Sequence, residues 1–247
     1  MRVGKNPSAA GNFSWIFARN CEGTEQLRII TEPGKNRGLS MSRKGILAVV
    51  SGFSGAGKGT LMKALLSEHA DQYALSISAT TRGPREGEVD GREYFFKTKE
   101  QFEQMIAEDA LIEHACYVGN YYGTPKSYVM EQLEAGKNVI LEIEIQGALA
   151  VKEKFPDTLL LFVTPPSAQE LERRLRGRGT ETDEVIKSRL KRAVEEAEFM
   201  DRYDYILVND ELETCVREMH ELIQAQSHKT SQNQEFIVEM KEDLKQF

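Results

Sequence analysis

The stretch GFSGAGKGT, residues 52–60, follows an apolar run at residues 46–50 and precedes a second apolar segment at residues 61–66. The first run is typical of a strand and the second of a helix. The spacing G-x-x-x-x-G-K between a strand and a helix predicts a phosphate-binding loop. Glycines let backbone N–H groups converge on an oxyanion, the helix N-terminus adds a positive dipole end, and Lys58 adds a point charge. A glycine-rich turn with an exposed lysine is the alternative, but it leaves the spacing unexplained.

The loop departs in one place from the common pattern of such loops. Gly59 follows the lysine at the position where Ser or Thr normally supplies a hydroxyl to magnesium, and Thr60 comes one position later. We interpret this displacement as a feature of nucleoside-monophosphate kinases, and it leaves the direct magnesium ligand open. The predicted nucleotide-binding residues are Gly52, Phe53, Ser54, Gly55, Ala56, Gly57, Lys58, Gly59 and Thr60.

Composition narrows the possible classes of protein. The 247 residues carry a net charge of −7, which argues against general nucleic-acid binding because that function needs a basic surface. The three cysteines are scattered, so we expect no disulfide framework and a cytoplasmic location. No apolar run approaches the roughly 20 residues of a membrane span. The four histidines lack metal-ligand spacing, so no structural zinc is expected.

From Met41 onward, predicted strands and helices alternate, which indicates a parallel sheet with helices on both faces. Less regular strands between residues 93 and 117 predict an inserted lobe. Residues 1–40 are rich in Gly, Asn, Ser and Pro without a sustained period, so we expect a disordered extension, with a folded arm as the alternative. From Ser227 we expect a partly ordered helix or tail. The expected strands are 46–51, 75–79, 93–96, 111–117, 138–144, 158–163 and 205–208, and the expected helices are 58–69, 99–108, 126–135, 147–153, 167–175, 182–200 and 211–226.

A second anion site is indicated by the stretch TTRGPREGEVDGREYFF, residues 80–96. Arg82 and Arg85 lie three apart, and Tyr94 follows a turn-forming Asp-Gly pair. Two guanidinium groups and a phenol hydroxyl are suited to hold a monophosphate dianion. A charged surface loop would explain the arginines alone, but beside a phosphate-binding loop the second phosphate site is the better interpretation.

These stretches, together with IEHACYVGNYYGTP, ILEIEIQGA, RLRGRGTET and YDYILVND, resemble the motifs of guanylate kinases in the same order, from about Lys44 to Gln226. The resemblance implies a P-loop kinase fold, a three-layer α/β/α core with a parallel sheet. It also implies a small α+β GMP-binding lobe near residues 76–125 and a mobile helical lid near residues 166–190. The implied reaction is ATP + GMP giving ADP + GDP, with Mg²⁺, in guanine nucleotide synthesis and recycling.

The resemblance also implies roles for single residues. It places the P-loop residues at ATP, four residues at the GMP phosphate (Arg82, Arg85, Tyr94 and Tyr122), and three at the guanine end (Ser78, Glu113 and Thr124). Glu142 and Glu144 match positions that are often aspartate, and they are counted with the GMP-binding residues. The two glutamates are two positions apart on the predicted strand, so their side chains would share one face. There they would hold the hydration shell of magnesium or the guanosine. The implied catalytic residues are Lys58, Arg82, Arg174, Arg178 and Arg189, the last three on a closing segment.

Three other classes of protein share some of these features. A non-catalytic guanylate-kinase-like protein-binding module has lost P-loop or lobe residues that are present here, including Lys58 and Glu113. A kinase for another nucleotide is a second alternative. A GTPase is disfavoured because no Asn-Lys-x-Asp motif occurs. We therefore expect an active ATP:GMP phosphotransferase whose partners are ATP and GMP, without nucleic acid or membrane, and the sequence leaves open whether it is a monomer or a homo-oligomer.

Overall fold

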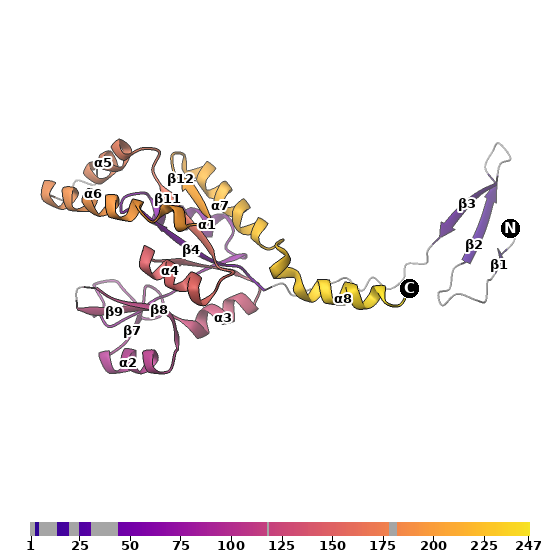
Figure 1. Cartoon of the computed structure of the whole chain (residues 1–247), viewed down its shortest axis with the longest axis horizontal. Helices are drawn as coiled ribbons and strands as arrows, with labels where there is room; N and C mark the ends of the chain where they lie inside the picture. Colours follow the sequence, from indigo (N-terminus) through magenta and orange to yellow (C-terminus); the bar gives the residue numbers. More distant parts are fainter. Residues whose placement is uncertain (1–2, 5–13, 20–24, 31–43, 118, 178–181) are drawn as a thin grey trace. The chain divides into compact units, whose positions relative to one another are not determined.

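The computed structural model describes residues 3–4, 14–19, 25–30, 44–117, 119–177 and 182–247. The chain divides into two compact units, Met1–Ser42 and Arg43–Phe247. The second unit is an α/β domain built on a five-stranded parallel sheet (Figure 1). The sheet has the order β12-β11-β4-β10-β5, where the strands are β4 (Leu47–Gly52), β5 (Tyr73–Leu75), β10 (Asn138–Glu142), β11 (Leu159–Thr164) and β12 (Tyr205–Val208).

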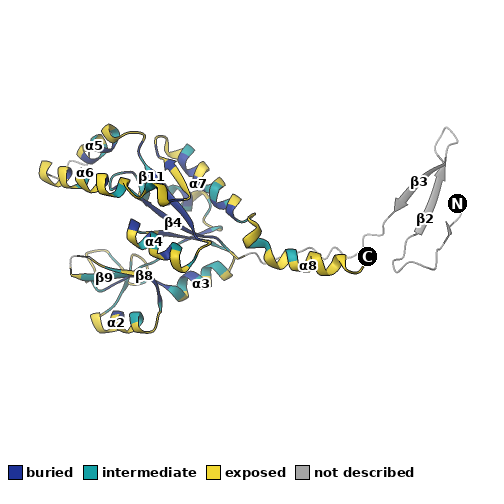
Figure 2. Cartoon of the chain, viewed as in Figure 1, coloured by how far each residue is buried: buried dark blue, intermediate teal, exposed yellow. Residues whose placement is uncertain are grey.

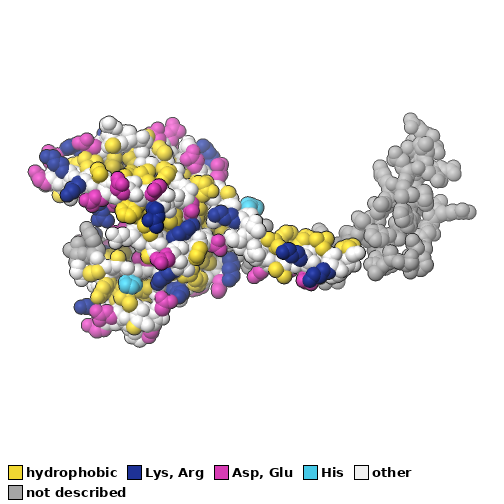
Figure 3. All heavy atoms as spheres, viewed as in Figure 1, with side chains coloured by type: hydrophobic (Ala, Val, Ile, Leu, Met, Phe, Trp, Pro, Cys, Tyr) yellow, Lys and Arg dark blue, Asp and Glu magenta, His cyan; other side chains and the backbone are white. Residues whose placement is uncertain are grey.

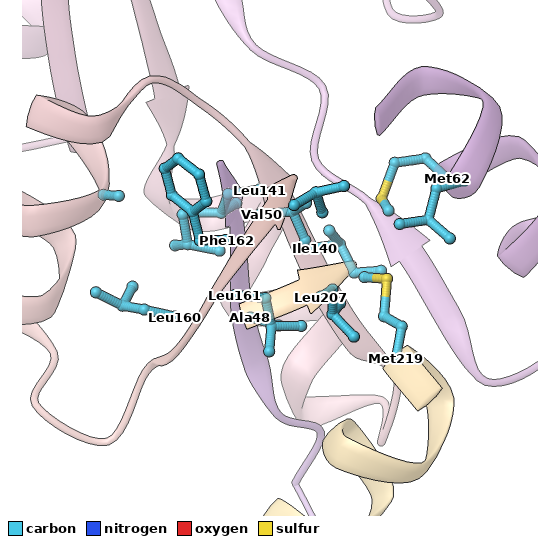
Figure 4. Packing of buried hydrophobic residues seen from close by; sticks show 14 of the residues in the cluster. Ala48, Val50, Met62, Ile140, Leu141, Leu160, Leu161, Phe162, Leu207 and Met219 are labelled. Atoms are coloured by element: carbon cyan, nitrogen blue, oxygen red, sulfur yellow. The ribbon is translucent and has the colours of Figure 1, made fainter. Parts of the chain in front are cut away.

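The central strands are apolar along their whole length because both faces of the sheet are covered. The sequences LAVVSG in β4 and LLLFVT in β11 are nearly all buried, as expected for a parallel sheet inside a domain. In Figure 4, Met62 and Met219 lie beside one face of the sheet, while Leu160 and Phe162 point away from them. The three-layer α/β/α core predicted from the sequence is therefore confirmed.

The helices that cover the sheet come from the segments that follow its strands in the chain. Helix α1 (Lys58–Glu68) packs against α7 (Leu212–Gln226) on one face. Helices α3 (Lys126–Glu134) and α4 (Ile145–Lys154) contact β10 and the β4–β11 pair, respectively. Figure 2 shows the resulting pattern, with dark buried strands between helices that are exposed on their outer sides.

The inserted lobe lies between β5 and α3. Its four-stranded sheet has the order β7-β6-β9-β8 and contains β6 (Ala79–Thr80), β7 (Phe95–Phe96), β8 (Leu111–Tyr117) and β9 (Asn120–Pro125). Helix α2 (Lys99–Ala107) starts with a capping box in which Thr98 and Gln101 exchange hydrogen bonds. Phe102 from this helix packs with Ala79 and Leu111 in a small separate core. The sequence analysis missed β9 because its sequence NYYGTP has no apolar–polar alternation.

Two helices follow β11 and β12 begins after them. They are α5 (Ala168–Gly177) and α6 (Asp183–Ala197), followed by a short 3-10 helix, η1 (Met200–Arg202). They occupy the segment where the sequence predicts the lid. Arg178, one of the predicted catalytic residues, lies outside the described residues.

After α7 the chain continues as η2 (Thr230–Asn233) and α8 (Gln234–Leu244), so the predicted helix or tail is a helix. Figure 3 shows hydrophobic side chains along α8, and Val238, Met240 and Leu244 are among its exposed residues.

The first unit contains β1 (Val3–Gly4), β2 (Ser14–Arg19) and β3 (Glu25–Ile30), which form an antiparallel sheet in that order. The sequence analysis predicted none of these strands. In this sheet Trp15 of β2 pairs with Ile29 of β3. Disorder of the whole stretch stays a prediction.

We expect a chain starting at Met41 to keep the fold and the activity, because the residues it lacks form a unit of their own by contact. The kcat/KM of the truncated chain should stay within about twofold of that of the full chain, because changes far from a site usually have effects no larger than this. Thermal melts and steady-state kinetics of both chains test this. A truncated chain that melts much lower, or loses most of its activity, would show that the first unit supports the second.

A histidine pair joins the C-terminal end of α1 to the middle of α7 and predicts a pH dependence of stability. The rings of His69 and His220 stack at 3.9 Å, and the Tyr73 hydroxyl is hydrogen-bonded to His220 Nδ1 at 2.9 Å. Burial, and then the neighbouring His69, lower the pKa of His220, although Glu221 and Glu68 oppose the shift. The unfolded chain, with a histidine pKa near 6.5, therefore takes up this proton first as the pH falls.

The contribution of His220 is thus complete above the unfolded pKa and is lost as the pH falls below it and through the lower pKa of the folded state. We expect His220→Gln to reduce the drop in melting temperature between pH 7.5 and pH 5.5. His228→Gln is the control, because His228 is exposed. Equal slopes in the wild type and His220→Gln would contradict the assignment.

Candidate active site

The phosphate-binding loop connects β4 to α1 at the carboxyl edge of the sheet. Gly55 and Gly57 have φ angles of 98° and 92°, a region that favours glycine, and Gly57 is the N-cap of α1. The Lys58 ammonium folds over the loop and donates to the carbonyls of Gly52 at 2.6 Å and Phe53 at 3.1 Å. The loop therefore combines glycines at positive φ with a lysine ammonium at its rim.

Asn209, at the end of β12, fixes the loop from behind. Its buried amide donates to the carbonyl of Ala56 at 2.8 Å, and its backbone N–H donates to Thr164 at 2.8 Å. From the sequence, this residue is noted only as part of the stretch YDYILVND, without a role of its own. The available signal was its position, since the carboxyl ends of parallel strands meet at one edge of the sheet.

We expect Gly57→Ala to destabilise the protein by about 1–3 kcal/mol and to impair the loop. A side chain at this φ is strained, and its Cβ would lie 2.5 Å from the Asn209 amide nitrogen that holds Ala56. Urea unfolding of the variant measures the loss. Gly59→Ala is the control, because a Cβ there meets nothing within 4 Å. Equal stability of the two variants would contradict the assignment.

A cavity of about 400 Å³ opens beside Lys58, at the carboxyl ends of β4 and β10. Three parts of the chain line it: the loop, the segment from the end of β10 to the start of α4, and α6. The lining residues are Gly52, Ser54, Lys58, Glu142, Ile143, Glu144, Ile145, Arg189, Arg192 and Glu196. One detail of the sequence analysis is wrong. Strand β10 ends at Glu142 and Glu144 is the N-cap of α4, so the two carboxylates do not share one strand face. The helix begins there because Ile145 turns into the core.

The predicted phosphate cradle is partly assembled in the lobe. The guanidinium carbon of Arg82 lies 5.3 Å from the centre of the Tyr94 ring, and the Tyr94 and Tyr122 rings are 6.2 Å apart. Tyr122 comes from β9, which pairs with β6 just before Arg82. Among the described residues, no hydrogen bond joins the side chains of Ser78 or Arg85 to this group. The structure thus brings together Arg82, Tyr94 and Tyr122.

Glu113 is a buried carboxyl in β8. It is 9% exposed, and the hydroxyl of Thr124 on β9 donates to its Oε1 at 2.7 Å. Burial raises the pKa of Glu113 above its ordinary value, the Thr124 hydrogen bond opposes this, and the charge of Glu144 adds to it. Gly147 of α4 leaves room beside this carboxyl, since a Cβ there would lie 3.4 Å from Oε2. A buried carboxylate needs hydrogen-bond donors, and a ligand can supply them.

The helices of the predicted lid bring arginines to the loop. Arg189 of α6 donates to the Ser54 hydroxyl at 3.0 Å. Arg174 of α5 donates to Glu170 at 2.7 Å and reaches toward the carbonyl of Ala56 at 3.5 Å. Arg192, which the sequence analysis missed, pairs with Glu144 at 3.1 Å. Arginine donors therefore lie on the side of the loop where phosphate groups would carry negative charge.

The family model described as Guanylate kinase matches residues 44–226. The chain belongs to the guanylate kinase family. A "Guanylate kinase" of Caldanaerobacter subterraneus subsp. tengcongensis is 47% identical over 205 residues, which cover 83% of this chain and 99% of the relative. A "Guanylate kinase" of Bacillus subtilis is 52% identical over 186 residues, covering 75% of this chain and 91% of the relative.

The structural comparison agrees. A guanylate kinase from Anaplasma phagocytophilum, known from a crystal structure, matches with a TM-score of 0.60 and 30% identity. The match covers 76% of this chain and 89% of that chain. The resemblance and the P-loop kinase fold inferred from the motifs are confirmed.

None of the helices in the described residues combines the length and the apolar character that a membrane crossing needs. On the face drawn in Figure 3, basic and acidic side chains are intermixed.

Proposed function

We propose that this guanylate kinase transfers the γ-phosphoryl group of ATP to GMP, giving ADP and GDP, in the cytoplasm. The observation that carries the proposal is that helix α4 connects the phosphate-binding loop with the lobe. Glu144, the N-cap of α4, lines the cavity beside Lys58. Gly147 of the same helix lies beside the buried carboxyl of Glu113 in the lobe.

On the donor side, the N–H groups of residues 52–60 and the Lys58 ammonium bind the phosphates of ATP. Lys58 would exchange its contacts with the Gly52 and Phe53 carbonyls for phosphate oxygens. The exposed Thr60 hydroxyl and the Glu142 carboxylate line one cavity with Lys58 and are hard oxygen donors that suit Mg²⁺. When bound with ATP, Mg²⁺ supplies charge neutralisation on the phosphates.

On the acceptor side, Arg82, Arg85, Tyr94 and Tyr122 bind the GMP phosphate, and Ser78, Glu113 and Thr124 bind the guanine end. Glu144 lies close enough to raise the pKa of Glu113, so the two carboxylates repel each other until a ligand supplies donors. The N1–H and N2–H₂ groups of guanine are side by side and match one carboxylate. This arrangement explains why the enzyme would accept guanine.

Phosphoryl transfer needs positioning and charge stabilisation rather than covalent work by side chains. The GMP phosphate is already ionised at neutral pH and needs no general base. Arg189 and Arg174, which reach the loop from α6 and α5, would neutralise the migrating group. Arg178 is proposed for the same role from its position in the sequence. A closed lid would also exclude water, which otherwise competes with GMP.

The test is an assay of ADP release with ATP, Mg²⁺ and each of GMP, AMP, CMP and UMP. GMP should be the preferred acceptor. ADP release that does not depend on GMP, or a preference for another monophosphate, would overturn the proposal. Absence of any transfer by the folded protein would favour the non-catalytic binding module.

A further inference from the structure

We propose that Glu88 is a positioning residue of the acceptor site: its carboxylate holds Arg82 against Tyr94 before the GMP phosphate arrives. The inference rests on the proposed function, because it assigns GMP as the molecule that Arg82 binds.

Glu88 contacts the guanidinium of Arg82 and the backbone of the same turn. Nη2 of Arg82 donates to both carboxylate oxygens of Glu88 at 2.9 Å, and the backbone N–H of Arg85 donates to Oε2 at 2.8 Å. The Glu88 N–H also donates to the Arg85 carbonyl at 3.0 Å. Glu88 thus closes the turn that contains both predicted phosphate-binding arginines.

The opposite side of Arg82 is limited by aromatic rings. Its guanidinium carbon lies 5.3 Å from the ring centre of Tyr94 and 5.9 Å from that of Phe96. Nη1 donates to the Gly83 carbonyl at 2.7 Å. A guanidinium carries five N–H donors, so these contacts leave donors for a phosphate. The side chains of Arg82 and Glu88 are only 16% and 17% exposed.

A second ion pair in the same loop shows what an ordinary surface pair looks like here. Arg92 and Glu93 are joined at 2.6 Å, and Glu93 also accepts the N–H of Val89 at 2.7 Å. Their side chains are 62% and 35% exposed, far more than those of Arg82 and Glu88. Exposed pairs of this kind contribute little. Glu93 therefore offers a control of equal charge and similar hydrogen bonding.

Holding Arg82 in advance matters because a long side chain such as arginine loses rotamer freedom when it is fixed in one position. If Glu88 already restricts that freedom, GMP binds without this loss. The same carboxylate lowers the net positive charge of the cradle. Restricting Arg82 strengthens GMP binding, whereas lowering the positive charge weakens it. The affinity of a Glu88 variant for GMP therefore shows whether the carboxylate positions Arg82 or competes with the phosphate.

The experiment measures the dissociation constants of GMP and guanosine by calorimetry, together with kcat and KM for GMP. Glu88→Ala should raise the Kd and the KM for GMP by about tenfold and leave kcat nearly unchanged. Binding of guanosine should not change, because guanosine has no phosphate. Glu88→Gln keeps one acceptor oxygen in the turn and should give an intermediate loss. Glu93→Gln should match the wild type.

Three results would overturn the inference. Tighter GMP binding by Glu88→Ala would mean that the carboxylate competes with the phosphate. Equal losses for GMP and guanosine would mean that Glu88 supports the fold of the lobe. Equal effects of Glu88→Gln and Glu93→Gln would mean that only net charge matters. Failure of the proposed function is separate, because the wild type would then not phosphorylate GMP.

Discussion

Lys58→Ala is expected to give a folded protein whose kcat is about 10²–10³-fold lower, the scale of losing one preorganised charge contact to the transition state. The ammonium lies at the rim of the loop and is held by the Gly52 and Phe53 carbonyls, so it is already placed for the donor phosphates. Lys58 is not one of the buried residues of α1, which are Leu61, Met62 and Leu65, so the substitution leaves the core around this helix intact.

Melting curves and steady-state kinetics with ATP and GMP check the first prediction. Lys99→Ala, on the exposed start of α2, removes the same charge from the lobe and should change neither quantity. A Lys58→Ala protein that melts normally and turns over within a few-fold of the wild type would show that the loop does not bind the donor phosphates.

Glu113→Gln is expected to lower kcat/KM for GMP, by an amount that corresponds to roughly 1–3 kcal/mol of lost transition-state stabilisation. The kcat/KM for AMP should change much less. The carboxylate accepts from Thr124 and is 9% exposed, so a guanine N–H pair would complete its hydrogen bonding. Adenine presents an acceptor at N1 and has no 2-amino group, which leaves the buried carboxylate unpaired. Sites built in this way reject the wrong base strongly. Glutamine keeps the size but offers one acceptor and one donor.

The decisive measurement is the ratio of kcat/KM for GMP to that for AMP, in the wild type and in the variant. The ratio should be large in the wild type and smaller in Glu113→Gln. Glu103→Gln, on the exposed face of α2, is the control for a lost carboxylate in the same lobe. If the ratio is unchanged in a folded Glu113→Gln protein, guanine is recognised elsewhere.

Much of the core could be predicted because local pattern and tertiary structure agree there. Strand β12 was predicted with its observed bounds, and the loop before α1 follows from glycines whose φ angles no other residue adopts easily. Strand β9 could not be found, because NYYGTP is a strand through its pairing with β8 and β6 and not through its own pattern. The strands in the first unit were missed for a similar reason, since each depends on its neighbour.

The site was predictable as a set of residues but not as an arrangement. The arginines of the lobe were identified, yet charge alone did not distinguish the partly buried Glu88 from the more exposed Glu93. Asn209 acts through a carbonyl of a loop that is distant in sequence, and only the strand order shows why it lies there. Glu144 was expected on a strand but is the N-cap of α4, because this helix begins earlier than its apolar period suggests.

The order of strands in the core has a consequence for synthesis of the chain. Strand β4 is the first of its sheet to be made, yet its neighbours are β10 and β11, with Leu47 beside Val139 and Ala48 beside Leu159. A ribosome adds about 5–20 residues per second, so β4 waits on the order of ten seconds for a partner. During that interval its apolar sequence LAVVSG has no sheet to join. Folding of the central sheet therefore cannot be completed strand by strand as the chain emerges, and β4 has both of its neighbours only after β11 has left the ribosome.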